Sequence, residues 1–401
     1  MKLCKIFTLT ILLTARIGIC QIDPTVAPVV YQQPGMDKVG VQKDIVYKTL
    51  NDTTVTFDIY YPPGFDKKSA LPVVIFNNGV GSNELPGWRV YQDWARLVAV
   101  NGMIAINHQS RRDKTLKDSE DLVDYLQQHA AELKLDKNRV AIWACSANVS
   151  VGLPLAMQPE RKYIRALVMY YGAGQPKDQV IKRQDLEIQV VRAGLDFYNL
   201  NKSLEGFVQK AMISDAHIEF INYPEGQHAF DVFDATPRSK AIIQQTLAFL
   251  KQKLAKDFPA NESFILTNSL LWHMVLEEKK TEEVIGEFKK AMTRYSKMPN
   301  HSPWFNHVID ERNLNQLGYE LLKNDRIEEA IRILVANQEA FPESPNVYDG
   351  LGDAYEKAGD KVKALANSKT ALEKLEKTTN LQPQMKEAIR ASAEAKIKRL
   401  Q

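Results

Sequence analysis

Residues 139–157 read RVAIWACSANVSVGLPLAM, in which an apolar strand pattern runs directly into a helical pattern. Ser146 stands at the junction, with Ala144 two residues before it and Asn148 two residues after it. A tight strand-to-helix turn of this kind lifts a serine hydroxyl above the edge of a sheet, and small residues at the two flanking positions let the helix pack closely. Ala144 meets this requirement, whereas Asn148 is bulkier than the glycine usually found there.

The chain on both sides of this junction alternates short apolar runs with helical patterns, from about residue 40 to residue 255. Such alternation is typical of a mostly parallel sheet covered by helices on both faces, a doubly wound α/β fold. The predicted strands are 54–61, 71–77, 103–107, 139–144, 166–171, 188–193 and 217–223. The predicted helices between and after them are 91–100, 119–133, 149–157, 202–212 and 239–254.

Two further polar residues follow later predicted strands. Asp196 comes after strand 188–193, and His228 comes after strand 217–223, on the loop before the last helix. Ligands of this class of sheet bind at the carboxyl ends of the strands. The order serine, acid, histidine is the chain order of serine hydrolases built on such a sheet. The sequence therefore predicts Ser146 as a nucleophile, His228 as its general base and Asp196 as the group that orients the histidine.

At this point a family resemblance can be stated. Residues 40–255 resemble an α/β-hydrolase, and EGQHAFDVFDATPRSKAIIQQTLAFL, residues 225–250, resembles the C-terminal segment of the dienelactone hydrolase family. The resemblance implies hydrolysis of an acyl ester through a covalent intermediate, with no cofactor and no metal.

Typical dienelactone hydrolases carry a cysteine at the turn, so Cys145 competes with Ser146 for the role of nucleophile. For Cys145, the two flanking positions would be Trp143 and Ala147. An indole does not fit where the turn needs a small side chain. The pattern therefore favours Ser146, and Cys145 is expected to be a buried thiol without a catalytic role.

Catalysis by such a serine also requires donors for a developing negative charge. The segment LPVVIFNNGVGSNELPG, residues 71–87, occupies the position of the loop that reads His-Gly-Gly-Gly in lipases and esterases. We expect the backbone amide of Ala147 to be one donor of this oxyanion hole, and that of Gly79 or Val80 to be the second. The sequence does not decide between Gly79 and Val80, and the alternative reading of NNG is an ordinary turn.

The sequence between the strands also bears on substrate size. Only residues 172–186 separate two predicted strands, which is too few for an inserted lid domain. We expect an open mouth lined by tyrosines, Phe197 and Trp88, suited to esters of small to medium size.

A basic group follows strand 103–107. His108, Arg111 and Arg112 lie together in the sequence, and such a group either binds a carboxylate or forms a solvated charged loop. A solvated loop is the more common outcome for such a cluster.

Beyond a polar linker at residues 256–262, the remaining region, 263–401, is helical throughout and contains a repeat. Leu317-Gly318 matches Leu351-Gly352 and Ala330 matches Ala364, each at an offset of 34 residues. The two units, 311–344 and 345–378, resemble the tetratricopeptide repeat (TPR). The resemblance implies a surface for a protein or peptide partner, or for contact with the hydrolase domain.

Two flanking segments complete this region. Residues 263–300 carry two more predicted helices, which we interpret as a degenerate preceding unit. Residues 384–400 are expected to form a polar capping helix.

Residues 1–20, MKLCKIFTLTILLTARIGIC, have the pattern of a secretory signal peptide. Lys2 and Lys5 precede a short apolar run, and Gly18 and Cys20 stand at the positions of a cleavage site. The sequence therefore predicts an exported, periplasmic or secreted protein whose mature chain begins with an extension at 21–39. A lipoprotein anchored at Cys20 is the alternative.

Composition narrows the functional classes. The 401 residues are 44% hydrophobic and 25% charged, with 52 basic and 49 acidic residues, which is too balanced for a nucleic-acid-binding protein. Removal of residues 1–20 would leave 49 basic and 49 acidic residues and Cys145 as the single cysteine. We therefore expect no internal disulfide, no metal site, no nucleic-acid partner and no transmembrane segment in the mature chain.

These observations favour an exported serine esterase that acts on a small acyl ester and carries TPR repeats. The alternative is an inactive hydrolase-fold scaffold that recruits a partner through the repeats, and Asn148 and the missing His-Gly-Gly-Gly motif are in its favour. Acyl transfer to an acceptor other than water would use the same residues.

Overall fold

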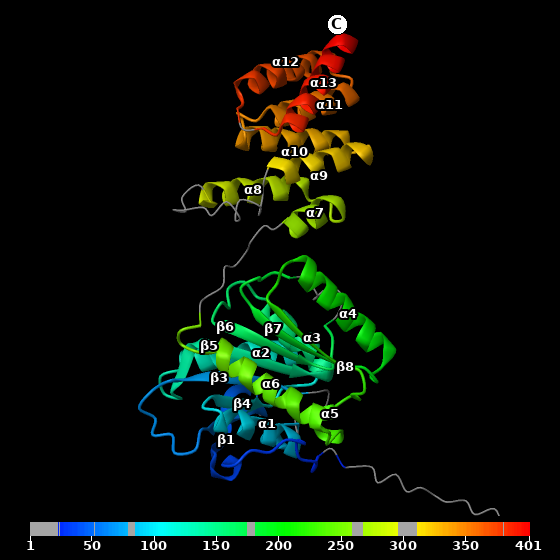
Figure 1. Cartoon of the computed structure of the whole chain (residues 1–401). Helices are drawn as coiled ribbons and strands as arrows, with labels where there is room; N and C mark the ends of the chain where they lie inside the picture. Colours follow the sequence, from blue (N-terminus) through cyan, green and yellow to red (C-terminus); the bar gives the residue numbers. More distant parts are fainter. Residues whose placement is uncertain are drawn as a thin grey trace, which may run out of the picture.

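The computed structural model describes residues 23, 25–51, 53–78, 85–174, 181–258, 268–295, 311–379 and 381–401. Within these residues, eight strands form one sheet in the order β1-β2-β4-β3-β5-β6-β7-β8 (Figure 1). β2 is antiparallel to both β1 and β4, and every other neighbouring pair is parallel. This arrangement confirms the predicted α/β-hydrolase fold, a doubly wound and mostly parallel sheet. The strands are β1 (Gly40–Leu50), β2 (Thr53–Tyr61), β3 (Leu71–Asn77), β4 (Ile104–His108), β5 (Leu135–Cys145), β6 (Ile164–Tyr170), β7 (Glu187–Ala193) and β8 (Ile218–Tyr223).

Helices cover both faces of the sheet and enclose two hydrophobic cores (Figure 1). One core contains residues of α1 (Arg89–Val100) and α6 (Pro237–Lys253), and the other contains residues of α2 (Thr115–Gln128), α3 (Val149–Ala156) and α4 (Tyr198–Ile213). Short helices complete this part of the chain: η1 (Met36–Lys38), η2 (Leu85–Gly87), η3 (Ser146–Asn148) and α5 (Phe230–Phe233).

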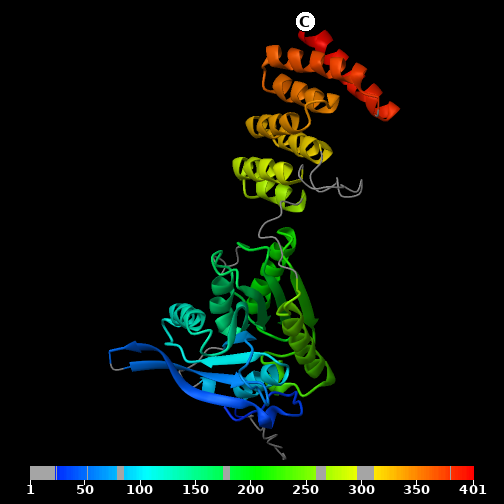
Figure 2. The same ribbon diagram turned by 90° about the vertical axis from the view of Figure 1, so that its left-hand side faces the viewer.

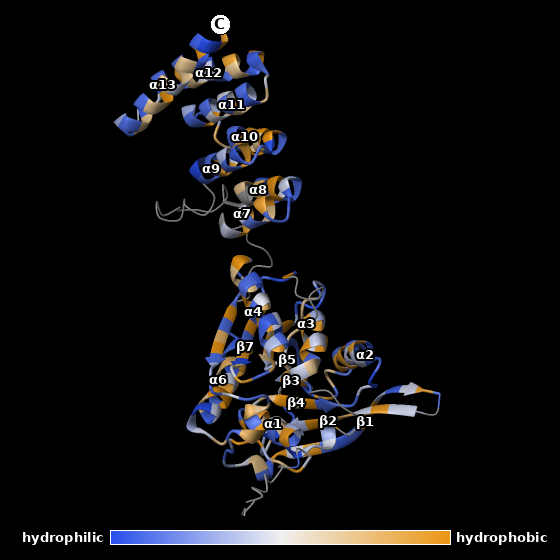
Figure 3. Cartoon of the chain, turned by 90° about the vertical axis from the view of Figure 1, so that its right-hand side faces the viewer, coloured by the Kyte–Doolittle hydropathy of each residue, from blue (hydrophilic) through white to orange (hydrophobic). Residues whose placement is uncertain are grey.

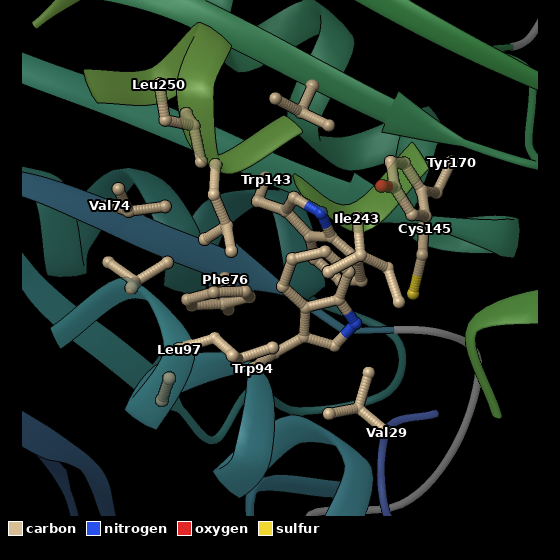
Figure 4. Close-up of a cluster of buried hydrophobic side chains, with 14 of the residues drawn as sticks. Val29, Val74, Phe76, Trp94, Leu97, Trp143, Cys145, Tyr170, Ile243 and Leu250 are labelled. Carbon is tan, nitrogen blue, oxygen red and sulfur yellow. The ribbon is translucent and has the colours of Figure 1, made fainter. Parts of the chain in front are cut away.

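The central strands alternate between these two cores. Val74 and Phe76 of β3 belong to the core under α1 and α6, whereas Val73 and Ile75 belong to the opposite core. Figure 4 shows Trp143 of β5 close to Phe76 and Trp94, and the ring centroids lie 5.1 and 5.2 Å from that of Trp143. Aromatic rings at such separations add to the free energy gained by burying their surface.

The seven predicted strands are all present, but the sequence did not predict β1. Only Tyr47 is buried within β1, so the strand lacks the apolar run that marked the others. Its register with β2 shifts twice, and Asp44 has a positive φ of 56°. β1 lies at the sheet edge, and Figure 2 shows it projecting with β2 from the rest of the domain. The short helix α5 also escaped prediction, and the helix predicted to end at residue 133 ends at Gln128.

The segment before β1 packs onto the domain. Val29 and Met36 are buried in the core under α1 and α6. The amide of Val30 donates to the carbonyl of Asp231 at 2.8 Å, and Thr25 accepts from the amide of Arg89 at 2.9 Å. Residues 25–39, expected as part of an extension at 21–39, therefore contribute to the core of the α/β domain, whereas residues 1–20 lie outside the described residues.

The C-terminal region consists of helices, as expected. The offset of 34 residues separates the starts of α9 and α11 and the starts of α10 and α12. A Cβ added at Gly318 would lie 2.6 Å from the Leu334 side chain, and one at Gly352 would lie 2.9 Å from Ser368 Oγ, so the paired helices touch at equivalent glycines. Hydrophobic and hydrophilic positions alternate on these helices (Figure 3). The helices are α7 (Asn268–Leu276), α8 (Thr281–Tyr295), α9 (Glu311–Lys323), α10 (Ile327–Ala340), α11 (Pro345–Lys357), α12 (Lys361–Lys377) and α13 (Pro383–Leu400). Within the described ranges, no helix has both the length and the apolar character needed to span a membrane.

Asp118 of α2 is the centre of a buried ionic cluster. Its carboxylate accepts from Lys48 of β1 at 2.9 Å and from the Arg111 guanidinium at 2.7 Å. Burial alone would raise the pKa of Asp118, but the hydrogen bonds from Arg111 and Lys48 outweigh it and lower the pKa to about 2. Arg111 is thus engaged within the fold and His108 is buried, so a carboxylate-binding site at this loop is not supported.

We expect Asp118→Asn to reduce the free energy of unfolding at neutral pH by about 1 to 2 kcal/mol. A lowered pKa contributes stability above the ordinary value, and this contribution is lost as the pH falls from about 4 to about 2. The difference between wild type and variant should therefore shrink over that interval, as measured by denaturant unfolding at several pH values. Asp113→Asn, in the same loop and exposed, is the control and should follow wild type. If the difference in free energy of unfolding between wild type and Asp118→Asn did not change with pH, the lowered pKa of Asp118 would be contradicted.

Candidate active site

The predicted strand-to-helix junction is present at the end of β5. Cys145 is extended, with φ −129° and ψ 155°, and Ser146 follows with a positive φ of 53°. A non-glycine residue with positive φ is strained, and such strain persists where the surrounding structure enforces it. η3 and α3 continue directly from Ser146, so the serine stands at the sharp turn between strand and helix.

Two glycines outside residues 144–148, Gly152 and Gly172, leave space for this turn. A Cβ at Gly172 would lie 2.1 Å from the Ser146 carbonyl oxygen, and one at Gly152 would lie 2.7 Å from the Ala144 Cβ. Gly172 follows β6 and Gly152 lies within α3, so the turn packs against bare backbone on two sides. Gly152 and Gly172 therefore allow the close packing around Ala144 and Ser146.

The structure brings the three predicted catalytic residues together. Ser146 Oγ lies 2.9 Å from His228 Nε2, and His228 Nδ1 lies 2.8 Å from Asp196 Oδ2. This network assigns the proton of His228 to Nδ1, which donates to Asp196, and leaves Nε2 to accept from the Ser146 hydroxyl. The side chain of Asp196 is 1% exposed, and that of His228 is 34% exposed. The histidine is therefore accessible from outside while its carboxylate partner is enclosed.

Backbone hydrogen bonds between neighbouring loops explain why Asp196 and His228 meet. β7 and β8 are adjacent and parallel, so the loops that follow them leave the sheet at the same edge. The amide of Gly194 donates to the Tyr223 carbonyl at 2.8 Å, and that of Leu195 donates to the Gly226 carbonyl at 2.9 Å. These bonds continue the pairing of the strands beyond the sheet and hold the loops side by side.

His228 is also held by residues that sequence reasoning missed. The Tyr171 ring meets the imidazole edge to face with centroids 4.9 Å apart, and its hydroxyl donates to Asp231 at 2.7 Å. Asp231 also accepts from Trp94 Nε1 at 2.7 Å, and burial raises the pKa of this carboxyl despite the two donors. Asp231 therefore holds Tyr171 against the histidine, while Asp196 is the carboxylate bonded to Nδ1. The sequence predicted Tyr171 as the last residue of strand 166–171 and gave no sign of its contact with the histidine.

Cys145 is buried on the other side of the turn. Its side chain is 1% exposed and belongs to the core under α1 and α6, beside Tyr170 (Figure 4). Its sulfur lies 3.9 Å from the Tyr91 hydroxyl. The thiol therefore points into the core, whereas the Ser146 hydroxyl contacts the histidine.

Of the predicted oxyanion donors, the structure describes Ala147 but not Gly79 or Val80. Ala147 lies in η3 directly after Ser146, as expected. Gly79 and Val80 lie outside the described residues, so their predicted role remains a prediction. Asn78, the last described residue before them, is 4% exposed and directly follows β3.

The surroundings of His228 include one of the two predicted aromatic residues of the mouth. The Phe197 ring lies 6.2 Å from the imidazole, whereas Trp88 stacks on Tyr91 at 6.1 Å. Across the described part of the chain, no group of three or more histidine, cysteine, aspartate or glutamate side chains could hold a metal ion.

Solved structures of several esterases are similar to this chain. One of two fungal esterases from Rhizomucor miehei has 14% sequence identity and a TM-score of 0.46, over 57% of this chain and 86% of that chain. A bacterial heroin esterase has 13% identity and a TM-score of 0.47, over 55% and 86%. A thermostable esterase from Pseudomonas putida has 14% identity and a TM-score of 0.47, over 56% and 86%. No protein-family model matches the chain, and no curated protein matches it. At these values the similarity concerns the fold alone, so the chemistry rests on the chain's own residues.

We expect Gly172→Ala to destabilise the protein by about 1 to 3 kcal/mol, because the added methyl group would collide with the Ser146 carbonyl. The control is Gly206→Ala within α4, where an added Cβ meets nothing within 4 Å. That control should be neutral or more stable by about 0.5 to 1 kcal/mol, since alanine favours a helix. Thermal unfolding of both variants checks this, and equal stability of the two would contradict the packing described for the turn.

Proposed function

We propose that this protein is a serine hydrolase of the α/β-hydrolase fold that cleaves carboxylic esters. The observation that carries the proposal is the hydrogen-bonded chain from Ser146 Oγ through His228 to Asp196, with distances of 2.9 and 2.8 Å. A serine hydroxyl is nearly unreactive at neutral pH, and a histidine held by a carboxylate is the group that activates it.

The proposed reaction has two halves. His228 Nε2 takes the hydroxyl proton as Ser146 Oγ attacks the acyl carbon, and the resulting imidazolium gives that proton to the leaving alkoxide. The product of this half is an acyl-Ser146 ester and a free alcohol. Water then attacks the acyl carbon with His228 as base, which releases the carboxylic acid and restores Ser146. Asp196 keeps the reactive tautomer of His228 and stabilises its cation throughout.

The proposed substrate is an ester of small to medium size with an apolar part. Leu195, Phe197 and Tyr198 flank Asp196 in the sequence and are 69%, 74% and 75% exposed, and the Phe197 ring lies 6.2 Å from the His228 ring. Large apolar side chains so exposed beside a catalytic histidine offer a surface for the apolar part of a substrate. The resemblance of residues 225–250 to dienelactone hydrolases is the basis for proposing that subtype.

The remaining parts of the proposal concern location and partners. We propose that residues 1–20 direct export, and that the helix pairs α9–α10 and α11–α12 are two TPR units that contact a protein segment. The offset of 34 residues between the pairs supports the second of these.

Labelling with a fluorophosphonate probe tests the activity. We expect wild type and Cys145→Ala to be labelled and Ser146→Ala to be unlabelled, because only Ser146 is bonded to His228. Labelling that persists in Ser146→Ala and disappears in Cys145→Ala would move the nucleophile by one residue. Absence of labelling in folded wild-type protein would favour the inactive scaffold.

Hydrolysis of p-nitrophenyl esters of increasing acyl length tests the substrate class. We expect Phe197→Ser to lower the ratio of kcat/KM for the butyrate over the acetate by about 3-fold to 10-fold, since butyrate adds two methylenes and each buried methylene contributes about 0.8 kcal/mol, or about 4-fold. Met212→Ser, at an apolar residue near the end of α4 that is 64% exposed, is the matched control and should leave the ratio unchanged. Equal ratios in wild type and Phe197→Ser would contradict a role of this surface in binding.

A further inference from the structure

A cavity of about 410 Å³ lies beside the first strands of the sheet. Its lining comes from β1, β2 and the end of β4, and from η2 and α1. Phe57 pairs with His108 and Asp58 pairs with Asn107, so the cavity lies at the carboxyl end of β4. This is the edge of the sheet at which Ser146 follows β5, and it is the edge where sheets of this class bind ligands. The volume is within the range of small-molecule sites.

A β-bulge in β1 shapes one wall of this cavity. The register of β1 with β2 shifts between Gln42 and Ile45. Lys43 and Asp44 therefore both lie opposite Asp58, and these three residues line the cavity. Asp44 has a positive φ of 56°, and its amide donates to Asp58 Oδ1 at 3.0 Å. Bulges redirect side chains beside functional sites, and this one gathers three charged residues on one wall.

The carboxylate of Asp58 can accept more hydrogen bonds than it receives. Among the described residues, its one hydrogen bond comes from the Asp44 amide, whereas a carboxylate has about four acceptor positions. Partial burial raises the pKa of Asp58, although the Asp44 amide and the nearby charge of Lys43 act in the opposite direction. The charged form is therefore poorly solvated, and a ligand that donates a hydrogen bond to it would stabilise it.

A buried asparagine joins β4 to the wall formed by η2. Asn107 is 0% exposed. Its Oδ1 accepts from the side-chain amide of Asn78 at 2.5 Å, and its Nδ2 donates to the Pro86 carbonyl at 3.1 Å. Asn107 and Pro86 both line the cavity, so this bond fixes the separation of two of its walls. A wall that is already in place lowers the entropy cost of binding a ligand.

Two glutamines add polar groups to the lining. The backbone of Gln109 is held on both sides, since its amide donates to the Thr56 carbonyl at 2.9 Å and its carbonyl accepts from the Tyr47 hydroxyl at 2.8 Å. Gln92 of α1 donates through Nε2 to the Gly87 carbonyl at 3.2 Å. An amide side chain offers donors and an acceptor together. The cavity therefore presents neutral polar groups as well as charges.

The mixture of charges restricts the class of ligand. Asp44 and Asp58 would repel an anion, and Lys43 would repel a simple cation. A hydroxyl group both donates and accepts hydrogen bonds. A neutral molecule with several hydroxyl groups can therefore bond to carboxylate, ammonium and amide groups at the same time.

We propose that this cavity binds a neutral saccharide, whose hydroxyl groups donate to Asp58 and accept from Lys43 and from the side chain of Gln109. The site goes beyond the proposed function, because binding there requires no reaction at Ser146. The hydrogen bonds to the charged groups contribute more to the affinity than those to the amides.

Saturation-transfer difference NMR with glucose, galactose, mannose, xylose and cellobiose tests the proposal. We expect wild type to bind at least one of them, and titration then gives its Kd. Asp58→Ala should raise this Kd about 10-fold to 100-fold and Gln109→Ala about 3-fold to 10-fold, because hydrogen bonds to charged groups are the stronger ones. The matched controls are Asp66→Ala, at an exposed aspartate after β2, and Gln42→Ala, at an exposed glutamine of β1. Both should match wild type.

The absence of saturation transfer from all five saccharides would overturn the proposal. Binding that Asp58→Ala and Gln109→Ala leave unchanged would also overturn it, because the saccharide would then lie elsewhere. If glucosamine or glucuronate bound at least 10-fold more tightly than the best neutral saccharide, the site would be one for a charged ligand.

Two further measures keep the test decisive. Thermal unfolding checks that each variant is folded, and Asp58→Asn, which has nearly the same shape, replaces Asp58→Ala if that variant does not fold. It should also raise the Kd, because the charge is lost. Failure of wild type to hydrolyse esters would contradict the proposed function and would leave this binding test unaffected.

Discussion

The hydrogen bond between Ser146 Oγ and His228 Nε2 is the contact on which the proposed chemistry depends. It joins the end of β5 to the loop after β8, 82 positions further along the chain, with β6 and β7 between them in the sheet. Ser146 has a positive φ at the sharp turn after β5. Hydrogen bonds between the loops after β7 and β8 hold Asp196 and His228 together, and His228 contacts the serine hydroxyl. The backbone thus places Ser146, Asp196 and His228 close together, and their side chains complete the hydrogen-bonded chain.

Buried asparagines lie at the carboxyl ends of the strands, and one of them is bonded to the turn that carries Ser146. Asn77, Asn78 and Asn107 are all at least nine-tenths buried. Buried amides of this kind cost free energy unless they are bonded, so proteins retain them where they fix a particular geometry. Buried Asp231 in turn accepts a hydrogen bond from Tyr171, whose ring packs against the histidine. Both buried polar groups and aromatic rings therefore contribute to the surroundings of the site.

The sequence predicted those parts of the molecule that depend on local patterns. The apolar run of β3, the junction at Ser146 and the polar residues after β7 and β8 could all be read from neighbouring positions. β1 could not, because an exposed edge strand has no apolar run to mark it. The contacts of Asn107 could not either, since they depend on β4 lying beside β3 after the chain has passed through α1. The same holds for Gly172, whose importance comes from the Ser146 carbonyl against its backbone.

The most direct measurement is localisation of the acyl intermediate. The protein would be mixed with p-nitrophenyl acetate, quenched in acid and digested, and tandem mass spectrometry would then locate any acetyl group in the peptide that contains both Cys145 and Ser146. The account predicts that any acetyl group trapped during turnover is an ester on Ser146. An acetyl thioester on Cys145 in its place would contradict it.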